Sequence, residues 1–460
     1  MQSFIFTDRQ EPTKSDVLKR IKNFREIYEP FEVEKSASQA ERCVQCGDPY
    51  CSASGCPLSN YIPHWLKKSA ENDLEYAFKL SNESSPCPEI FGRICPQDKL
   101  CEGACTLNDD GYGAITIGSI ETSITERGFE AGYKINFPGI TSDKKVAVIG
   151  SGPASLSAAH FLLRAGIKVE MFEKDDRPGG LFTYGIPGFK LNKEVVEKRF
   201  DILKNAGLTL HLNCEVGKDI TFDSLKNDFD ALFIGVGASQ SKLIKLNGED
   251  SKGVVLAIEY LRDVQKKIFE NKAVASTDVS DKKVLVIGGG DTAMDCVRTA
   301  LREGASSVTC AYRRDEKNMP GSKKEVNNAK EEGVEFLYNA SPTELLTENN
   351  SINGVSFLKT ELGDPDESGR QRLNEISGSD FDFSADIVIL ALGFDQQALP
   401  FIDDSIARDK WGSLVVNECY ETSSEMIYAG GDCIRGADLA VTAARDGREA
   451  AFDMIGKLLG

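Results

Sequence analysis

Residues 144–156, KKVAVIGSGPASL, constrain the fold of this chain more than any other stretch. The apolar run 146–149 lacks alternation and is rich in β-branched residues, which predicts a buried parallel strand. The run breaks at a Gly-Ser-Gly turn, a helical pattern follows, and a second strand is predicted at 168–172. The chain therefore opens a βαβ unit here.

The turn of this unit has the fingerprint of a dinucleotide site. Gly150 allows the tight turn, and Gly152 lets the backbone approach a pyrophosphate that rests on the helix N-terminus. Glu173, at the end of the second strand, is placed to accept hydrogen bonds from ribose hydroxyls. The third fingerprint position holds Ser155 instead of glycine, so the helix–strand packing must accommodate a hydroxymethyl group. We predict nucleotide binding, with an ordinary βα turn as the alternative.

A second unit of the same kind begins with KKVLVIGGGDTAMDCVRTAL. Gly288 and Gly290 fit the GxGxxA variant of the fingerprint, and the next predicted strand ends in Arg313 and Arg314. Two guanidinium groups stand where the first unit has an acid, and they match a 2′-phosphate in charge and in bidentate geometry. We therefore predict NADPH binding. The alternative is a solvated arginine pair, and Asp315 is close enough in sequence to neutralise one of the two.

Eight of the 13 cysteines form two runs, CVQCGDPYCSASGCP and CPEIFGRICPQDKLCEGAC, joined by a helical stretch. Thiolates hold iron–sulfur clusters, and a Cys-Pro ending is common in such runs. Zinc is one alternative, although it prefers paired CxxC units and only Cys43 and Cys46 form one here. Free thiols are the other. We predict a small helical domain wrapped around inorganic clusters.

The net charge and the N-terminal residues indicate which partners and which cellular location to expect. The net charge of −18 and the pI of about 4.9 argue against nucleic acids and anionic membranes as partners. The N-terminal residues lack the pattern of a signal peptide, and no run approaches the roughly 18 apolar residues of a membrane helix. We expect a cytoplasmic protein, and 460 residues suggest about three domains.

The C-terminal part supplies further candidate contacts to a flavin. Gly431 and Asp432 follow a short predicted strand, and the Asp432 carboxylate could accept a bond from a ribityl hydroxyl. The helix after them would point its N-terminus at the flavin and favour negative charge on the reduced ring. The strand at 385–393 is expected to return the chain to the first nucleotide unit, and the polar stretch 363–369 is expected to be a loop. The remaining candidate cofactor contacts adjoin these motifs: Pro153, Ala154, Gly180, Leu181, Asp291, Thr292, Gly393 and Thr442.

The predicted cofactors must pass electrons in a fixed order. NADPH delivers two electrons as hydride, whereas a [4Fe–4S] cluster accepts one at a time, so a flavin must lie between them. Such transfer needs orientation and electrostatics from the protein, and we therefore name no catalytic side chain. The three histidines (His64, His160 and His211) lie in no motif. A dithiol reductase is disfavoured because residues 181–191, after the Gly-Gly pair, contain no cysteine.

Together the motifs resemble the small (β) subunits of NADPH-dependent glutamate synthase, essentially end to end. The matching segments are CVQCGDPYC, RICPQDKLCEGACTLND, ITIGSIE, GSGPASL, GIPGFKL, GGGDTAMDCVRTA, YRRDEKNMPGSKKEV and AGGDCIRGADLAVTA. The resemblance implies an α/β chain with a helical domain for two [4Fe–4S] clusters at 1–142. It also implies an FAD domain in two parts, 143–250 and 386–460, with an NADPH domain inserted at 251–385.

The resemblance also implies a partner and a set of cluster ligands. The partner is a large (α) subunit that carries FMN, hydrolyses glutamine and adds the ammonia to 2-oxoglutarate, so a hetero-oligomer is expected. By similarity to pyrimidine dehydrogenases, one cluster takes Cys43, Cys46, Cys51 and Cys105, and the other takes Cys56, Cys95, Cys101 and Glu121. Cys87 is a rival to Glu121 for the last position.

Two other functions stay open at this point. A related flavin–cluster enzyme, of the pyrimidine dehydrogenase or ferredoxin:NADP oxidoreductase type, would share every motif above. An iron–sulfur or zinc scaffold that only senses NADP(H) is the alternative from another class.

Overall fold

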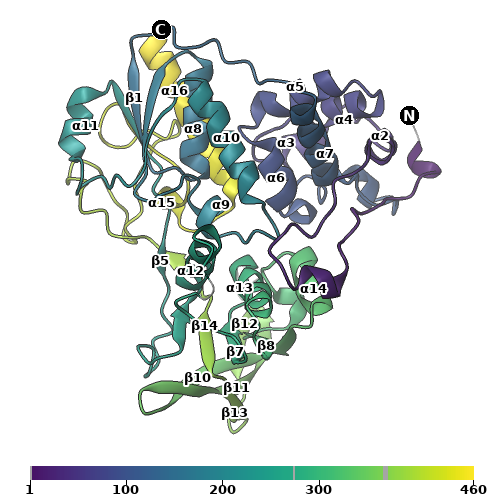
Figure 1. The fold of residues 1–460 in the computed structure, drawn as a ribbon, viewed down its shortest axis with the longest axis vertical. Coiled ribbons are helices and arrows are strands. Elements are labelled where there is room, and N and C mark those ends of the chain that lie inside the picture. Colours follow the sequence, from purple (N-terminus) through teal and green to yellow (C-terminus); the bar gives the residue numbers. More distant parts are fainter. Residues whose placement is uncertain (1–2, 273–274, 366–370) are drawn as a thin grey trace.

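The structure, a computed structural model, describes residues 3–272, 275–365 and 371–460. The chain forms a helical N-terminal unit, a first sheet unit beside it, and a second sheet unit below both (Figure 1). The C-terminal helix returns to the first sheet unit, so the second unit is inserted between two parts of the first. None of the described helices is both long and apolar enough to cross a membrane.

The helical unit is built from short helices around one apolar core. Trp65, Phe78, Ile120 and Ile124 are buried in it, and most of the clustered cysteines pack at its edge. Its helices are short because prolines, glycines and the cysteine loops interrupt the chain every ten residues or so. They are α2 (Val33–Glu41), α3 (Tyr50–Ala53), α4 (Ile62–Ala70), α5 (Leu74–Ser84), α6 (Pro88–Ile94) and α7 (Ile117–Glu130), with 3₁₀ turns η2 (Gln97–Lys99) and η3 (Thr106–Asn108).

The first sheet is parallel throughout, in the order β16-β4-β1-β2-β3. Its strands are β1 (Lys145–Ile149), β2 (Lys168–Phe172), β3 (Thr209–His211), β4 (Ala231–Ile234) and β16 (Ile427–Ala429). The principal helices of the unit are α8 (Pro153–Arg164), α10 (Lys193–Asn205) and α16 (Ala440–Leu459). The predicted β1–α8–β2 unit is thus present, with β1 in the middle of the sheet.

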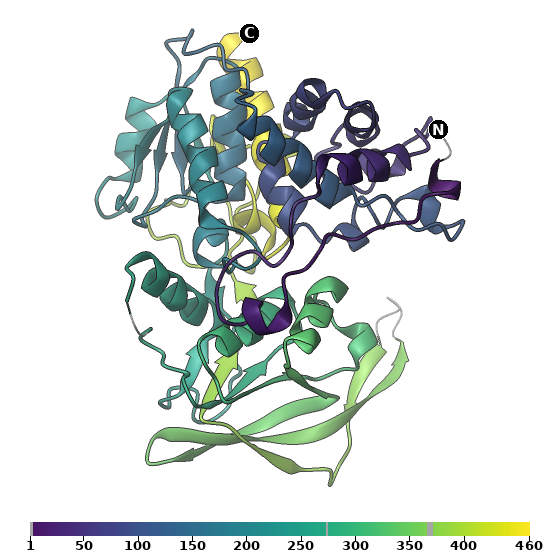
Figure 2. The same ribbon diagram turned by 45° about the vertical axis from the view of Figure 1, so that its right-hand side comes forward.

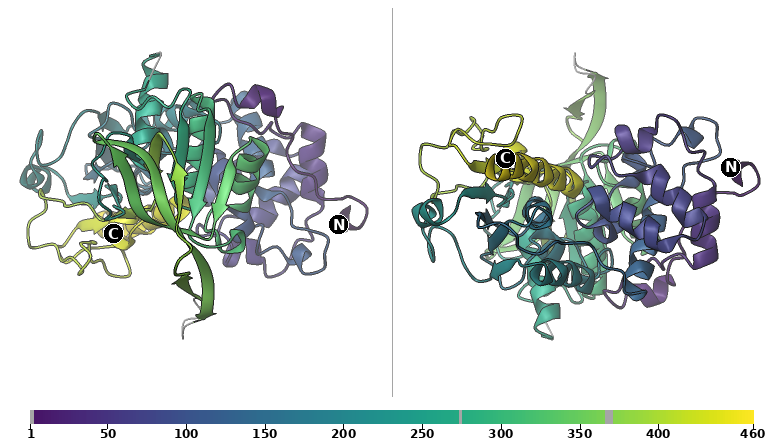
Figure 3. Two further views of the ribbon diagram at one scale, coloured as in Figure 1. Left: turned by 90° about the horizontal axis from the view of Figure 1, so that it is seen from below. Right: turned by 90° about the horizontal axis from the view of Figure 1, so that it is seen from above.

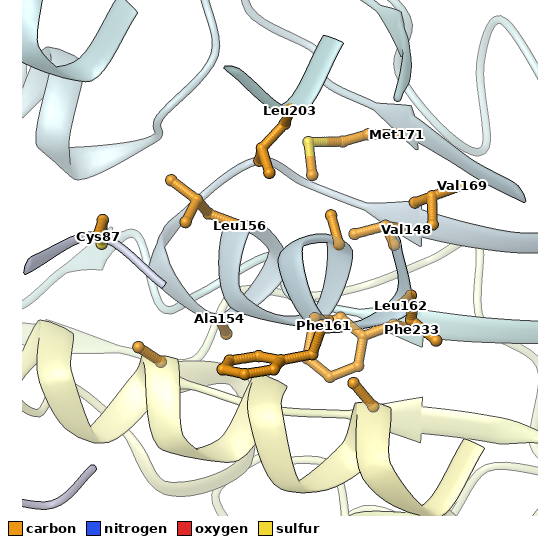
Figure 4. Close-up of a cluster of buried hydrophobic side chains, with 14 of the residues drawn as sticks. Cys87, Val148, Ala154, Leu156, Phe161, Leu162, Val169, Met171, Leu203 and Phe233 are labelled. Atoms are coloured by element: carbon orange, nitrogen blue, oxygen red, sulfur yellow. The ribbon is translucent and has the colours of Figure 1, made fainter. Parts of the chain in front are cut away.

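Helix α8 is buried on almost all sides, and most of its residues are apolar, as this position requires. Figure 4 shows Leu156 on the side of Met171 and Leu203, and Phe161 on the side of α16. The two helices come very close, because a Cβ at Gly447 of α16 would lie only 2.0 Å from the carbonyl oxygen of Ala154. Glycine at that position therefore fixes the approach of α16 to the helix that begins at the fingerprint turn.

The second sheet is also parallel, in the order β6-β14-β7-β8-β9. Its strands are β6 (Val254–Leu256), β7 (Lys283–Ile287), β8 (Ser307–Tyr312), β9 (Glu335–Tyr338) and β14 (Ile387–Leu390). Its helices include α12 (Ala257–Phe269), α13 (Asp291–Arg302) and α14 (Lys323–Glu331).

The expectation for the strand at 385–393 was wrong in one respect. Strand β14 lies in the second sheet, between β6 and β7, instead of returning the chain to the first sheet. The return follows it, through the short pair β5 (Gln240–Ser241) and β15 (Phe394–Asp395), and ends at β16. The four residues of β14 are fully buried in the sheet, as a parallel strand between two neighbours requires.

An antiparallel sheet extends from the second unit, away from the rest of the molecule (Figures 2 and 3). It contains β10 (Ala340–Glu348), β11 (Ser351–Pro365), β12 (Gln371–Glu375) and β13 (Phe381–Ser384). The stretch 363–369, expected to be a loop, begins inside β11, and residues 366–369 lie outside the described part of the chain.

The N-terminal segment runs between the helical unit and the second sheet unit (Figure 2). It contains α1 (Val17–Arg20), whose Arg20 reaches Glu332 just after α14 with an Nε–Oε1 distance of 2.9 Å. The same carboxylate accepts from Arg298 and Arg302 at 2.9 and 2.7 Å, and all four side chains are almost completely buried. This ionic network attaches the start of the chain to the second nucleotide unit.

Candidate cofactor sites

Four of the clustered cysteines surround one small space in the helical unit: Cys43, Cys46, Cys51 and Cys105. Three of them come from the first cysteine run and one from the end of the second. Two of the sulfurs have polar neighbours, since Nε2 of Gln45 donates to Sγ of Cys43 at 3.3 Å and Thr106 Oγ1 is 3.4 Å from Sγ of Cys46. The structure thus gathers the first predicted ligand set around a single space.

The second predicted set surrounds a neighbouring small cavity: Cys56, Cys95, Cys101 and Glu121. Glu121 lies on α7 and is 7% exposed, and its Oε1 accepts a hydrogen bond from Nδ2 of Asn60 at 2.8 Å. Burial raises the pKa of Glu121 to about 8. A carboxyl group is therefore held against three thiols inside the protein.

Cys87 is close to this cavity but does not line it. It is fully buried at the edge of the apolar cluster of the first sheet unit, near Leu156 (Figure 4). Between the two rivals for the last ligand position, the lining favours Glu121.

The donor set suits an iron–sulfur group better than a bare ion. In the described part of the chain, no three His, Cys, Asp or Glu side chains converge tightly enough to hold a single metal ion. A multi-atom cluster holds its thiolates farther apart than one ion does, and both sets surround a cavity. Burial raises the pKa of Cys51 to about 12 and those of Cys95 and Cys101 well above the usual value, so these thiols need a bound metal to ionise.

A much larger cleft lies between the helical unit and the two sheet units, with an empty volume of about 2730 Å³ including its mouth. The turn after β1 forms part of its wall. Gly150 has a φ of +88°, and a Cβ there would lie 2.7 Å from the carbonyl oxygen of Gly235, so only glycine fits. A Cβ at Gly152 would meet nothing within 4 Å, which leaves room for a ligand at the N-terminus of α8.

Glu173 lines the same cleft at the end of β2. The Ser151 hydroxyl donates to its Oε2, and the backbone N–H of Asp175 donates to its Oε1 at 2.8 Å. Burial raises the pKa of Glu173, and these two bonds oppose the rise. These two bonds therefore orient the Glu173 carboxylate independently of any bound ribose.

Ser155 is accommodated by a gap in the neighbouring strand end. Gly235 carries no side chain, and the Ser155 hydroxyl lies 3.4 Å from its carbonyl oxygen and 3.5 Å from that of Ile149. The departure from the glycine fingerprint is therefore compensated locally.

Most of the predicted flavin contacts line this cleft. The residues of the set that do so are Gly150, Gly152, Pro153, Ala154, Glu173, Gly180, Leu181, Gly431 and Asp432. Thr442 and Gly393 are outside the lining, although both neighbours of Thr442 belong to it. Burial raises the pKa of Asp432 to about 7, and its Oδ1 accepts from the backbone N–H of Asp438 at 3.3 Å.

The second fingerprint segment reaches the cleft through the first residues of α13. Asp291 and Thr292, at the start of α13, line it, whereas Gly288, Gly290 and the two arginines do not. Arg313 is exposed, and Nη2 of Arg314 donates to the carbonyl oxygen of Gln371 at 3.3 Å.

Asp315 does not neutralise either arginine in the structure. Its Oδ1 accepts from the backbone N–H and the side-chain amide of Asn318, at 2.9 and 2.8 Å, and caps the 3₁₀ turn η4 (Glu316–Asn318). The positive charge at the end of β8 therefore remains available to an anion.

The cleft and the second cysteine cavity share a wall. Cys95, Gln97 and Val441 line both spaces, and Ile117 lines both cysteine cavities. The three spaces thus form a row from the cleft into the helical unit.

Several residues of the cleft wall were not identified in the sequence analysis. The segment 93–97 lines the cleft although it belongs to the cysteine domain. Lys190 pairs with Asp295 in the cleft wall, with Nζ 2.9 Å from Oδ1. Arg262 of α12 pairs with Asp175 of the first unit in the same wall. The motif GIPGFKL contains Lys190, but nothing local in the sequence indicates its partner.

Comparison with known proteins agrees with this arrangement. The sequence model for dihydropyrimidine dehydrogenase domain II, 4Fe-4S cluster, matches residues 20–133, and that for pyridine nucleotide-disulphide oxidoreductases matches 144–447. The glutamate synthase [NADPH] small chain of Escherichia coli K12 is 45% identical over 97% of both chains. The chain belongs to the glutamate synthase small-chain family. It is an NADPH-dependent oxidoreductase with a 4Fe-4S domain, and the predicted α/β fold is confirmed.

Two further comparisons concern a curated protein and a solved structure. An E. coli protein named "Putative oxidoreductase AegA" is 44% identical over 97% of this chain and 69% of its own length. Among solved structures, Mycobacterium tuberculosis FprA in complex with NADPH superposes with a TM-score of 0.59, at 20% identity, over 69% of this chain and 85% of its own. That likeness concerns the fold alone.

Proposed function

We propose that this family member is the small subunit of a glutamate synthase. It would take hydride from NADPH at FAD and deliver electrons singly, through two [4Fe–4S] clusters, to an FMN-containing large subunit. The reaction served is L-glutamine + 2-oxoglutarate + NADPH + H⁺ giving two L-glutamate and NADP⁺, in which the coenzyme supplies both reducing equivalents.

The observation that carries this proposal is the row of three adjoining spaces. A cleft with dinucleotide features shares Cys95 with a cavity lined by three thiols and a carboxyl group. That cavity in turn shares Ile117 with one lined by four thiols. A chain that only bound NADP(H) would not need two thiol-lined cavities in line with its cleft.

The residues of the chain serve to bind and orient. The backbone at Gly152 and the N-terminus of α8 receive a pyrophosphate, and Glu173 accepts from a ribose. Arg313 and Arg314 attract the 2′-phosphate of the coenzyme. A flavin in the cleft supplies the exchange between a two-electron donor and one-electron acceptors, so no side chain has to act as acid or nucleophile.

The same geometry supports an assignment of the cluster ligands. We assign Cys43, Cys46, Cys51 and Cys105 to one cluster, and Cys56, Cys95, Cys101 and Glu121 to the cluster beside the cleft. We place the domain boundaries near residues 142 and 250, and the last one after β14 instead of before it, because β14 pairs within the second sheet.

Isolation of the native complex tests the proposal. The chain should co-purify with a large subunit, and the complex should form glutamate from glutamine and 2-oxoglutarate at the expense of NADPH. Loss of NADPH-driven flavin reduction in the isolated chain would refute the oxidoreductase part. Flavin reduction with a different co-purified acceptor would refute only the glutamate synthase part.

The second candidate is an NADPH-oxidising subunit for another acceptor, of the pyrimidine dehydrogenase or ferredoxin:NADP oxidoreductase type. One observation keeps it in view: AegA, named only as a putative oxidoreductase, is 44% identical to this chain, against 45% for the glutamate synthase small chain, so this level of similarity does not fix the acceptor. Glutamine-dependent glutamate formation separates the two candidates.

A further inference from the structure

The wall of the cleft contains a buried ion pair between the two nucleotide units. Lys190 lies between α9 (Leu181–Tyr184) and α10 of the first unit, and Asp295 lies on α13 of the second. Nζ of Lys190 is 2.9 Å from Oδ1 of Asp295, and the side chains are 12% and 7% exposed. Both line the cleft. The pair therefore joins the two units at the surface that faces the coenzymes of the proposed function.

This part of the wall is rich in acids. Asp291 and Glu325 line it together with Asp295. Nη1 of Arg298 is 2.5 Å from Oε2 of Glu325, and the Asp291 carboxylate accepts a backbone N–H. Within the described residues, Lys190 is the cation that pairs with Asp295. Burial raises the pKa of Asp295 to about 6, and Lys190 opposes that rise.

The position of the pair assigns it to one half of the dinucleotide. Arg313 and Arg314 mark the 2′-phosphate end, at the far end of β8 and outside the cleft lining. Asp295 lies one helical turn beyond Asp291, on the side where α13 meets the first unit and its cleft. On the proposed function, a coenzyme that reaches from the arginines to a flavin in the cleft would pass Asp295 with its nicotinamide half.

We propose that Lys190, acting through Asp295, is a positioning residue for the nicotinamide half of NADPH, an inference that rests on the proposed function. The ammonium group neutralises a desolvated carboxylate that would otherwise face the negatively charged coenzyme. It also ties α13, which carries the coenzyme, to the unit that carries the flavin. Removal of Lys190 therefore leaves the Asp295 carboxylate unpaired beside the coenzyme and weakens the contact between the two units.

A series of charge-removing and charge-keeping variants tests this by binding, without turnover. The oxidised holoprotein is titrated calorimetrically with NADP⁺ and with 2′,5′-ADP, which lacks the nicotinamide half. Lys190→Met should weaken NADP⁺ binding about tenfold and leave 2′,5′-ADP binding unchanged. Lys190→Met combined with Asp295→Asn, which restores neutrality, should recover most of the affinity, and Lys190→Arg should bind like the wild type.

Lys204→Met is the matched control, because Lys204 pairs with Asp201 on the exposed side of α10 and should have no effect on either ligand. Flavin absorbance and thermal unfolding report whether each variant folds. Equal losses for NADP⁺ and 2′,5′-ADP, an unaffected Lys190→Met, or a double variant no better than the single one would each overturn the inference. A wild type that binds neither ligand would instead refute the proposed function, and the inference with it.

Discussion

The preference for NADPH over NADH should reside in the two arginines at the end of β8. Arg313 is exposed, and Arg314 is half-buried with one bond to the Gln371 carbonyl. A charge-assisted hydrogen bond contributes about 1.5–3 kcal/mol, equivalent to about 10- to 150-fold in affinity. Because exposure and salt weaken the contact of Arg313, its contribution should lie at the lower end, about tenfold, and should fall as ionic strength rises.

The assay is rapid-mixing flavin reduction with each coenzyme at low and high salt. Arg313→Ala should raise the NADPH concentration for half-maximal rate about tenfold, and the double variant with Arg314→Ala should raise it further, towards the upper limit of about 150-fold. The values for NADH should hardly change. The limiting rate should stay the same, because these groups bind the ground state and the transition state alike.

Arg25→Ala, at an exposed arginine outside the cleft lining, is the matched control. Arg314→Ala should also lower thermal stability slightly, since it removes the bond to the Gln371 carbonyl, whereas Arg313→Ala should not. If the double variant loses NADPH- and NADH-driven reduction in equal measure, the arginines are structural, and the coenzyme preference must come from other residues.

Anaerobically purified protein should contain one FAD and eight irons per chain, by chemical analysis, if two [4Fe–4S] clusters are present; stoichiometric zinc with little acid-labile sulfide would contradict the cluster assignment. Glu121→Ala should remove or perturb one cluster in the electron paramagnetic resonance spectrum while FAD stays bound, and Cys87→Ala should preserve both; the reverse pattern would transfer the ligand role to Cys87. Glu89→Gln should lower the free energy of unfolding by about 3–5 kcal/mol in urea titrations, because Glu89 of α6 holds the fully buried Arg199 of α10 at 2.5 and 2.7 Å; a loss under about 1 kcal/mol would mean that water replaces the pair. Although burial opposes it, arginine hydrogen bonds lower the pKa of Glu332 from 4.5 to about 2, so its stabilising effect is complete above about pH 5 and is lost as the pH falls towards 2. The difference in unfolding free energy between the wild type and Glu332→Gln should shrink over that range, and a constant difference would refute the assignment.

Local patterns in the sequence were sufficient for the two βαβ units. A glycine turn between an apolar strand and a helix, as at Gly150 and Gly288, depends on neighbours within about 30 residues, and the structure has both units where they were predicted. The cysteine runs likewise indicated clusters by their composition alone. These features are determined by short-range geometry and by the chemistry of the donor atoms, and both are written directly in the chain.

Local sequence does not determine to which of the two sheets a buried strand belongs. The run 385–393 is apolar and buried whether it completes the first sheet or the second, so its sequence does not distinguish them. Only its pairing with β6 and β7 decides the matter, because hydrogen bonds between strands form across more than 100 residues of chain.

Tertiary structure also decided which polar groups meet. Cys105 and Cys43 line the same cavity although 62 residues separate them in the sequence. Lys190 and Asp295 form an ion pair although 105 residues separate them. The sequence favoured Glu121 and left Cys87 as a rival. The packing of α6 and α7 turns Glu121 to the cavity and buries Cys87 in the apolar cluster beside it. The sequence alone thus determined the donor types and the nucleotide folds, whose information is local. The sharing of walls between the cleft and the two cysteine cavities arises only when distant segments pack together.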